Sequence, residues 1–364
     1  MSRPFAPGVP ETRSFPLPTW ERLQRQVLKE YGTLALLHSP PQGMEPLRRA
    51  IAAYVNLERG AQATPERVLV LTSSQQAMTL CATVLLDAGE RIFIEDPVYH
   101  GARKAFDAAG LACVPVPLDD QGMQVARLHD AASPARAVFL TPSHQFPTGA
   151  TLALDRRLAV IEWARQNQAW IIEDDYDSEF HYEGKPTACV QGLDPHGRTI
   201  YIGTFTKSLF PGLRIGFMVV PTALAPALAL LLDRAAPRGR TADQRALAEF
   251  IVSGQFALHL RRMRRLYREQ TSKVRQLVAQ HFPPGTRLAR PQGGYFVWLE
   301  LPRQVDTLLL HQQALAHGIS IAPGPIFSAK RAFPNYFRLN FGHPATPRQD
   351  QALATLGRLI KRQL

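Results

Sequence analysis

The sequence predicts an α/β protein in which helices cover a mostly parallel, seven-stranded sheet, with a smaller α+β lobe attached. Two observations lead to this prediction. Between residues 68 and 220, short apolar segments alternate with longer amphipathic ones, which is typical of a parallel sheet with helices on both faces. Beyond residue 245 the alternation stops, and a long helical segment is followed by widely spaced strands, as in a separate α+β unit.

The chain begins with a proline-rich arm and two helices. Residues 1–18 contain five prolines, which favour extended backbone. A helix is expected over residues 19–31, with the Thr19 hydroxyl as its N-cap. A second helix is expected over residues 47–57, after the turn-rich sequence SPPQGMEP.

The alternating region predicts seven strands and three helices. The strands are expected over residues 68–71, 91–95, 112–116, 137–140, 169–172, 199–203 and 215–220. The helices are expected over residues 75–86, 104–109 and 154–166. Four of the strands are followed by polar or unusual side chains, namely Ser73-Ser74, Tyr99, Asp174 to Tyr176, and Thr204 to Lys207. Because ligands of open α/β sheets bind outside the carboxyl ends of the strands, these side chains are expected to converge on one pocket.

The C-terminal part predicts the smaller lobe. A long helix over residues 242–282, interrupted near Gly254, precedes strands over 295–301, 319–322 and 337–341 and helices over 307–317 and 348–364. We expect residues 1–50 to form an arm and helices that join the small domain. Residues 51–250 are then the large domain and residues 251–364 the small one.

Composition bounds the class of protein. The formal net charge is +12, and much of the excess lies in HLRRMRRLYR, at residues 259–268. Helical spacing there predicts a solvated arginine face over a buried apolar face, although the charge also leaves nucleic-acid binding open. The sequence has three widely spaced cysteines, no secretory signal and no apolar run of membrane-spanning length. A cytoplasmic protein with no membrane segment and no metal site is expected.

Lys207 is the most unusual of the strand-end residues. A lysine at the end of a buried strand has a destabilised ammonium form, so its amine can react with an aldehyde. The hydroxyls of Thr204 and Thr206, the guanidinium of Arg214, and Ser74 at a helix N-terminus could together bind a phosphate.

Two adjacent carboxylates follow the strand over residues 169–172. Asp174 or Asp175 could hold a protonated pyridine nitrogen, but adjacent strand residues point to opposite sides, so only one can face the ring. Residue type alone leaves the choice open. Tyr176 could bond a phenolic oxygen of the ring, and Tyr99 could stack on it. Gly101 leaves space beside Tyr99 that the sequence does not assign.

Several segments, in the right order, resemble one family over nearly the whole chain. GTFTKSLFPGLRIG resembles the cofactor-lysine segment of fold-type I pyridoxal-phosphate enzymes, the aspartate aminotransferase superfamily. EDDYDSEFHY, TPSHQFPTG, EDPVYHGAR and HLRRMRRLYR are more specifically similar to the aminotransferase-like domain of MocR-type regulators in the GntR family. The resemblance implies the fold-type I architecture, pyridoxal 5'-phosphate as cofactor and a homodimer with its active site near the interface.

The resemblance also implies roles for individual residues. Lys207 would hold the cofactor as a Schiff base, and Asp174 rather than Asp175 would pair with the pyridine nitrogen. Tyr176 would bond the ring oxygen and Tyr99 would stack on the ring. The phosphate would be held by Ser74, Gln75, Thr204, Thr206 and Arg214. Arg338 would clamp the substrate carboxylate, and Gly43 would lie over the substrate.

The chain departs from the family at two points. Ordinary aminotransferases have an asparagine before Pro-Thr-Gly that bonds the ring oxygen, and here the residue is Phe146, so His144 or Tyr176 is expected to replace that bond. MocR regulators also carry an N-terminal winged helix-turn-helix, for which this sequence has no counterpart.

Two functions follow as expectations. One is a transaminase that exchanges an amino group between an amino acid or amine and a 2-oxo acid; the other is an effector-sensing domain that binds cofactor and amino ligand with little turnover, with DNA as a partner only if a winged helix belongs to the full protein.

Overall fold

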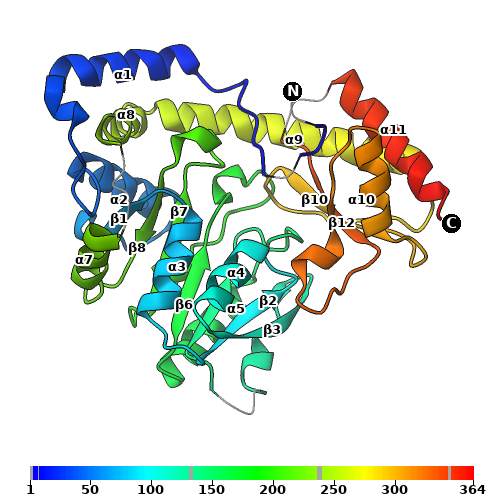
Figure 1. Cartoon of the computed structure of the whole chain (residues 1–364), viewed down its shortest axis with the longest axis horizontal. Helices are drawn as coiled ribbons and strands as arrows, with labels where there is room; N and C mark the ends of the chain where they lie inside the picture. Colours follow the sequence, from blue (N-terminus) through cyan, green and yellow to red (C-terminus); the bar gives the residue numbers. More distant parts are fainter. Residues whose placement is uncertain (1–2, 7, 131–133, 236–239, 343–345) are drawn as a thin grey trace.

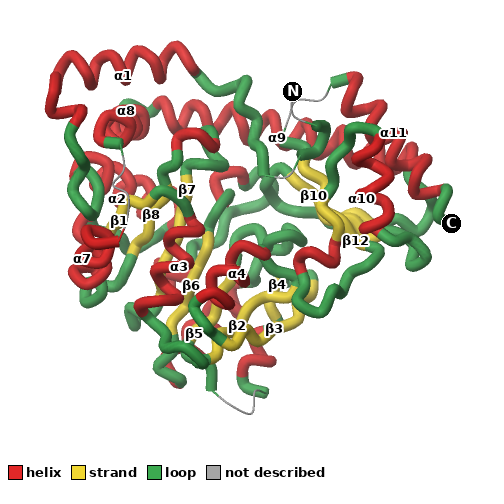
Figure 2. The backbone as a smooth tube through the Cα atoms, viewed as in Figure 1, coloured by secondary structure: helices red, strands yellow, loops and turns green. Residues whose placement is uncertain are grey.

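The computed structural model describes residues 3–6, 8–130, 134–235, 240–342 and 346–364. Two sheets organise these residues, a large one and a small one (Figures 1 and 2). Pro7, one of the five prolines of the arm, lies outside the described residues. Within the described ranges, none of the helices has the length and hydrophobicity that a membrane span requires.

The large sheet has the strand order β1-β8-β7-β6-β5-β2-β3-β4. Its strands are β1 (Val68–Leu71), β2 (Arg91–Asp96), β3 (Ala112–Asp119), β4 (Gly122–Met123), β5 (Ala137–Leu140), β6 (Trp170–Asp174), β7 (Thr199–Thr204) and β8 (Gly216–Val219). The pairs from β3 through β2, β5 and β6 to β7 are parallel, whereas β8 runs antiparallel to both β7 and β1. The seven predicted strands are all present, and the eighth, β4, is a two-residue hairpin partner of β3.

Helices cover both faces of this sheet because successive strand residues point to opposite sides. Ile92 belongs to the cluster under α3 (Ser74–Val84), α4 (His100–Ala108) and α7 (Ala225–Ala235). Its neighbour Phe93 belongs to the opposite cluster, where its ring meets Trp163 of α5 (Leu154–Gln166) at 5.6 Å. The fold class predicted from the sequence is thereby confirmed. Helix α7 was not predicted, although Pro221-Thr222 separates it from strand β8.

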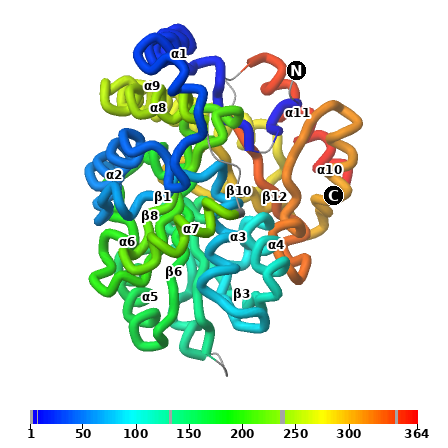
Figure 3. The backbone as a smooth tube through the Cα atoms, turned by 60° about the vertical axis from the view of Figure 1, so that its left-hand side comes forward, coloured from blue at the N-terminus to red at the C-terminus, as the bar shows by residue number. Residues whose placement is uncertain are grey.

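The small sheet is antiparallel, with the order β11-β12-β10-β9. Its strands are β9 (Arg287–Leu288), β10 (Phe296–Glu300), β11 (Ala322–Pro323) and β12 (Tyr336–Asn340), and it lies beside α10 (Thr307–Ala316) and α11 (Pro347–Lys361) (Figure 3). The predicted strand over residues 319–322 is wrong for most of its length. Only Ala322 pairs within it, and the Ser320 N–H instead donates to the carbonyl of Pro4 in the arm at 3.1 Å.

The long helical segment breaks at Gly254, as predicted. Gly254 adopts a φ of 76°, which a glycine tolerates, between α8 (Thr241–Val252) and α9 (Gln255–His281). On α9, Leu260, Met263 and Tyr267 are buried. Between them, Arg264 lies 3.3 Å from a carboxylate oxygen of Glu58. The arginine-rich segment is therefore part of an amphipathic helix, whose apolar side chains are buried on one face, as its spacing predicted.

The N-terminal helices lie against α8. Both α1 (Leu17–Tyr31) and α2 (Glu45–Arg59) pack on it, and α1 runs along the outside of the molecule (Figure 3). Helix α1 begins two residues before the predicted start, so Thr19 is not its N-cap; Pro18 falls in the first turn, where proline is tolerated. The division into domains at residues 51 and 251 stays a prediction.

Candidate active site

A cavity of about 640 Å³ lies where the carboxyl ends of β1, β2, β6 and β7 face the small sheet. The structure brings nine of the predicted site residues together on its wall. They are Ser74, Gln75, Tyr99, Asp174, Tyr176, Thr204, Thr206, Lys207 and Arg338. Three others, His144, Gly43 and Arg214, do not line it.

Lys207 follows β7 and projects its amine into the cavity. Its Nζ donates to the carbonyl oxygen of Gly8 in the N-terminal arm at 3.2 Å. Burial lowers the pKa of the Lys207 ammonium to about 8, and the charge of Arg338 acts in the same direction, against the two nearby aspartates. A substantial fraction of the amine is therefore neutral and nucleophilic in mildly alkaline solution.

The two adjacent carboxylates that the sequence left equivalent are both buried, but they lie in different surroundings. Asp174 lines the cavity, and its buried Oδ1 has no hydrogen-bond partner among the described residues. Burial raises the pKa of Asp174 to about 8, and the charges of Asp175 and Asp177 add to this effect. A cationic N–H group placed beside Asp174 would supply the missing partner and restore its ionised form.

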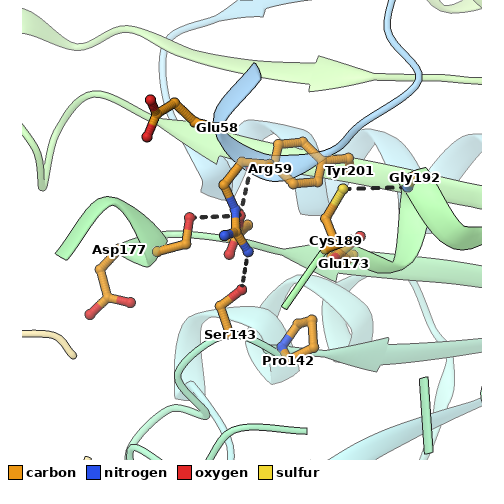
Figure 4. A network of polar contacts seen from close by, with 12 residues as sticks. Glu58, Arg59, Pro142, Ser143, Glu173, Asp177, Cys189, Gly192 and Tyr201 are labelled. Atoms are coloured by element: carbon orange, nitrogen blue, oxygen red, sulfur yellow. Dashed lines mark hydrogen bonds and ion pairs between the residues drawn. The ribbon is translucent and has the colours of Figure 1, made fainter. Parts of the chain in front are cut away.

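Asp175 does not line the cavity and belongs instead to a buried polar network, in which Figure 4 shows Arg59, Ser143 and Tyr201. Its Oδ2 accepts hydrogen bonds from Arg59 Nε at 2.9 Å and from the Tyr201 hydroxyl at 2.6 Å. Arg59 also donates to Ser143 Oγ at 2.8 Å. Although burial alone would raise it, the Arg59 charge and the surrounding hydroxyls hold the pKa of Asp175 at about 2. Asp175 is therefore a structural anion.

Replacing Arg59 by methionine is expected to lower the free energy of unfolding by at least about 3 kcal/mol, because it leaves the Asp175 charge buried without its partner. The measurement is urea unfolding of the two proteins. Arg127→Met is the matched control, since the Arg127–Asp130 ion pair is solvent-exposed. A loss no larger than that of the control would contradict the structural role of the Arg59–Asp175 pair.

The cavity wall also has the groups that an anion requires. Ser73 caps helix α3 by accepting a hydrogen bond from the Gln76 N–H at 3.2 Å, so Ser74 and Gln75 lie in the first turn, at the positive end of the helix dipole. The hydroxyls of Thr204 and Thr206 lie on the same wall. Arg214 does not; its side chain is exposed, in a left-handed turn after Pro211–Leu213.

Arg338, on β12, is buried among aromatic rings at the cavity wall. Its guanidinium carbon lies 4.4 Å from the ring centre of Phe146 and 5.1 Å from that of Phe296. Its Nε has no hydrogen-bond partner among the described residues, and burial lowers its pKa. A buried guanidinium in this state is ready to bind a carboxylate, for which its planar fork is suited.

Phe146 lies between Tyr99 and Tyr176, with ring centres 5.3 and 5.7 Å away. The space that Gly101 leaves is occupied by the ring of Tyr99 itself, because a Cβ at Gly101 would lie 2.5 Å from that ring. Tyr176, which lines the cavity, donates its hydroxyl to the backbone carbonyl of His144 at 2.8 Å.

The structure places His144 and Gly43 elsewhere. The ring of His144 is turned into the interior, where Nδ1 lies 2.9 Å from Asp177 Oδ1. Gly43 is packed so closely that a Cβ would lie 2.4 Å from Val70. The N-terminal glycine on the cavity wall is instead Gly8, where a Cβ would lie 3.5 Å from Lys207 Nζ. Nothing in local sequence distinguishes Gly8 from Gly43, since only the fold of the arm brings Gly8 to Lys207.

Comparison with known proteins identifies relatives along nearly the whole chain. The family aminotransferase class I and II matches residues 11–354. The probable rhizopine catabolism regulatory protein MocR of Rhizobium meliloti is 37% identical over 88% of the chain, which spans 64% of that protein's length. Aromatic-amino-acid aminotransferase 1 of Thermococcus litoralis is 29% identical over 99% of the chain and 88% of its own length.

Solved structures agree with this. LysN, the α-aminoadipate aminotransferase of Thermus thermophilus, complexed with N-(5'-phosphopyridoxyl)-L-leucine, superposes with a TM-score of 0.92 at 30% identity. The match covers 100% of this chain and 92% of that one.

Proposed function

Because the chain belongs to the aminotransferase class I and II family, we propose that it is a pyridoxal 5'-phosphate-dependent aminotransferase acting on an amino acid through Lys207. Pyridoxal 5'-phosphate is the cofactor of this fold and family. The observation that supports the proposal most strongly is the pairing, in one cavity, of a buried lysine with lowered pKa and a buried arginine whose Nε has no partner among the described residues.

The residues fit this cofactor at both of its polar ends. The unpartnered Oδ1 of Asp174 suits a ring N–H, and the first turn of α3 with Thr204 and Thr206 suits the phosphate. Tyr99 and Tyr176 flank the space for the ring. When bound, the cofactor supplies an aldehyde carbon that accepts the amino group and a ring that withdraws electrons from the substrate.

The chain's own residues have distinct tasks in the reaction. Arg338 binds the substrate carboxylate and so orients the bond between Cα and its hydrogen. Lys207, partly neutral in mildly alkaline solution, is the base that can take the proton from Cα and return it. Asp174 would be ionised with a cationic ring N–H beside it, which would offset the effect of burial on its pKa. The aromatic side chains around Arg338 exclude water and strengthen its attraction for the carboxylate.

A second function is favoured by the relationship to MocR of Rhizobium meliloti, which is named as a regulatory protein and of which this chain spans 64%. In that case the same cavity would bind cofactor and amino ligand as an effector-sensing domain, with little turnover. In this second proposal the protein is a homodimer. DNA is a partner only if a winged helix belongs to the full protein. A cytoplasmic location stays a prediction in either case.

Spectroscopy of the cofactor-loaded protein separates the two functions. An amino donor is expected to shift the cofactor from its aldehyde to its amine form, and a 2-oxo acid is expected to shift it back repeatedly. Each cycle should release one new amino acid, measured by chromatography. A stable spectral change on adding the amino compound, with no keto product and no reversal by any 2-oxo acid, would contradict the enzyme and favour the sensor.

A further inference from the structure

The part of the cavity around Arg338 has an apolar wall. Six side chains from the small lobe form it, namely Phe296, Leu308, Ile321, Pro323, Ile326 and Phe327. The guanidinium carbon of Arg338 lies 5.7 Å from the ring centre of Phe327, as well as near Phe146 and Phe296. A ligand whose carboxylate is held by Arg338 therefore places the rest of its structure among these apolar side chains.

Basic side chains on the cavity wall are few. Among the described residues that line it, Arg338 is the only guanidinium and Lys207 the only ammonium. The other basic groups are two histidines. Burial lowers the pKa of His100, with nearby Lys104 acting in the same direction, so the uncharged form of its ring is favoured. His311, on α10, has a buried Nδ1 without a partner among the described residues, which leaves it available to a polar group of the ligand.

We propose that the substrate is a monocarboxylic 2-amino acid with a large, uncharged and mainly apolar side chain, and that dicarboxylic amino acids are rejected. This inference rests on the proposed function. With Arg338 holding the α-carboxylate, a second carboxylate placed against these apolar side chains would lose hydration, and no further guanidinium or ammonium among the described lining residues could pair with it, which is unfavourable. An aliphatic or aromatic side chain gains from burial on the same wall.

Matched ligands test the wall directly. Norleucine has a terminal methyl group where 2-aminoadipate has a carboxylate. Hexanoate and adipate differ in the same way. We expect norleucine to convert the cofactor of the loaded protein with kcat/KM at least about 100-fold above that of 2-aminoadipate. Hexanoate should bind at least about 100-fold more tightly than adipate by titration calorimetry. Equal or better binding of the dicarboxylates would overturn the inference. It would indicate that a further cationic side chain contacts the ligand.

Two adjacent leucines of α10 supply a test with its own control. Leu308 lines the cavity and is 40% exposed, whereas Leu309 does not line it and is 44% exposed. Leu308→Arg is expected to reduce the preference for hexanoate over adipate by at least about tenfold, because it provides a partner for the second carboxylate. Leu309→Arg should leave it unchanged. An unchanged preference in Leu308→Arg, or the same change in both variants, would contradict the assignment of the wall.

The binding measurements with hexanoate and adipate test this inference separately from the proposed function. If neither amino acid converts the cofactor, the aminotransferase proposal fails. Hexanoate and adipate still report on the wall, because neither carries an amino group and neither needs turnover. If both amino acids react equally well, the aminotransferase proposal stands and the substrate class is wrong.

Discussion

Lys207→Ala is expected to abolish transamination, with kcat lowered by at least about 10⁴-fold, because it removes both the amine that holds the cofactor and the base at Cα. The variant should also lose the visible absorption band of lysine-bound cofactor while keeping the far-ultraviolet circular dichroism of the folded protein. Both effects follow from the position of the Lys207 amine, which projects into the cavity and donates a hydrogen bond to the Gly8 carbonyl of the arm at 3.2 Å.

Lys104→Ala is the matched control for this prediction. Lys104 lies on α4 with an exposed side chain and is absent from the cavity wall. The control should keep both the absorption band and the activity. A Lys207→Ala protein that retains the band would show that another amine holds the cofactor.

Arg338→Ala is expected to weaken binding of carboxylate ligands by about 2 kcal/mol or more, which is roughly 30-fold in Kd. The reason is that Arg338 is the only guanidinium among the described residues of the cavity wall, and that it is 6% exposed. Ligand affinity is measured by calorimetry with hexanoate, and the cofactor affinity separately by absorption.

The control for Arg338→Ala is Arg287→Ala on the same small sheet. Arg287 is 81% exposed at its side chain and pairs loosely with Glu300 at 3.6 Å, so its removal should leave hexanoate binding unchanged. Loss of cofactor binding together with ligand binding in Arg338→Ala would indicate a collapsed cavity. Unchanged hexanoate affinity would refute the role of Arg338 as the carboxylate clamp.

The strand ends were predictable from the sequence because each is marked by a change in residue type. An apolar strand followed at once by Ser73-Ser74, or by Thr204 to Lys207, is a local signal, and the rule that parallel strands share one carboxyl edge then brings such residues together. Helix α5 and strands β1 and β5 have the predicted bounds for the same local reason.

What the sequence could not decide depends on contacts between distant segments. Residue type alone left Asp174 and Asp175 equivalent, and they are distinguished by Arg59, which lies 116 residues from Asp175 and holds it away from the cavity. In the same way, the N-terminal glycine that reaches Lys207 is Gly8 rather than Gly43. Gly8 and Lys207 are 199 residues apart in the sequence, so no local pattern links them. The exposed position of Arg214 also depends on the turn that follows Lys207, which Pro211-Gly212 marks without showing where the Arg214 side chain lies.

The proposed function depends above all on Lys207 as the amine that holds the cofactor in this cavity. The most direct measurement is reduction of the cofactor-loaded protein with borohydride, followed by peptide mass spectrometry. We expect the reduced cofactor to be attached to Lys207 in a one-to-one ratio. Attachment to a surface lysine such as Lys104, or no attachment at all in a protein that binds the cofactor, would contradict it.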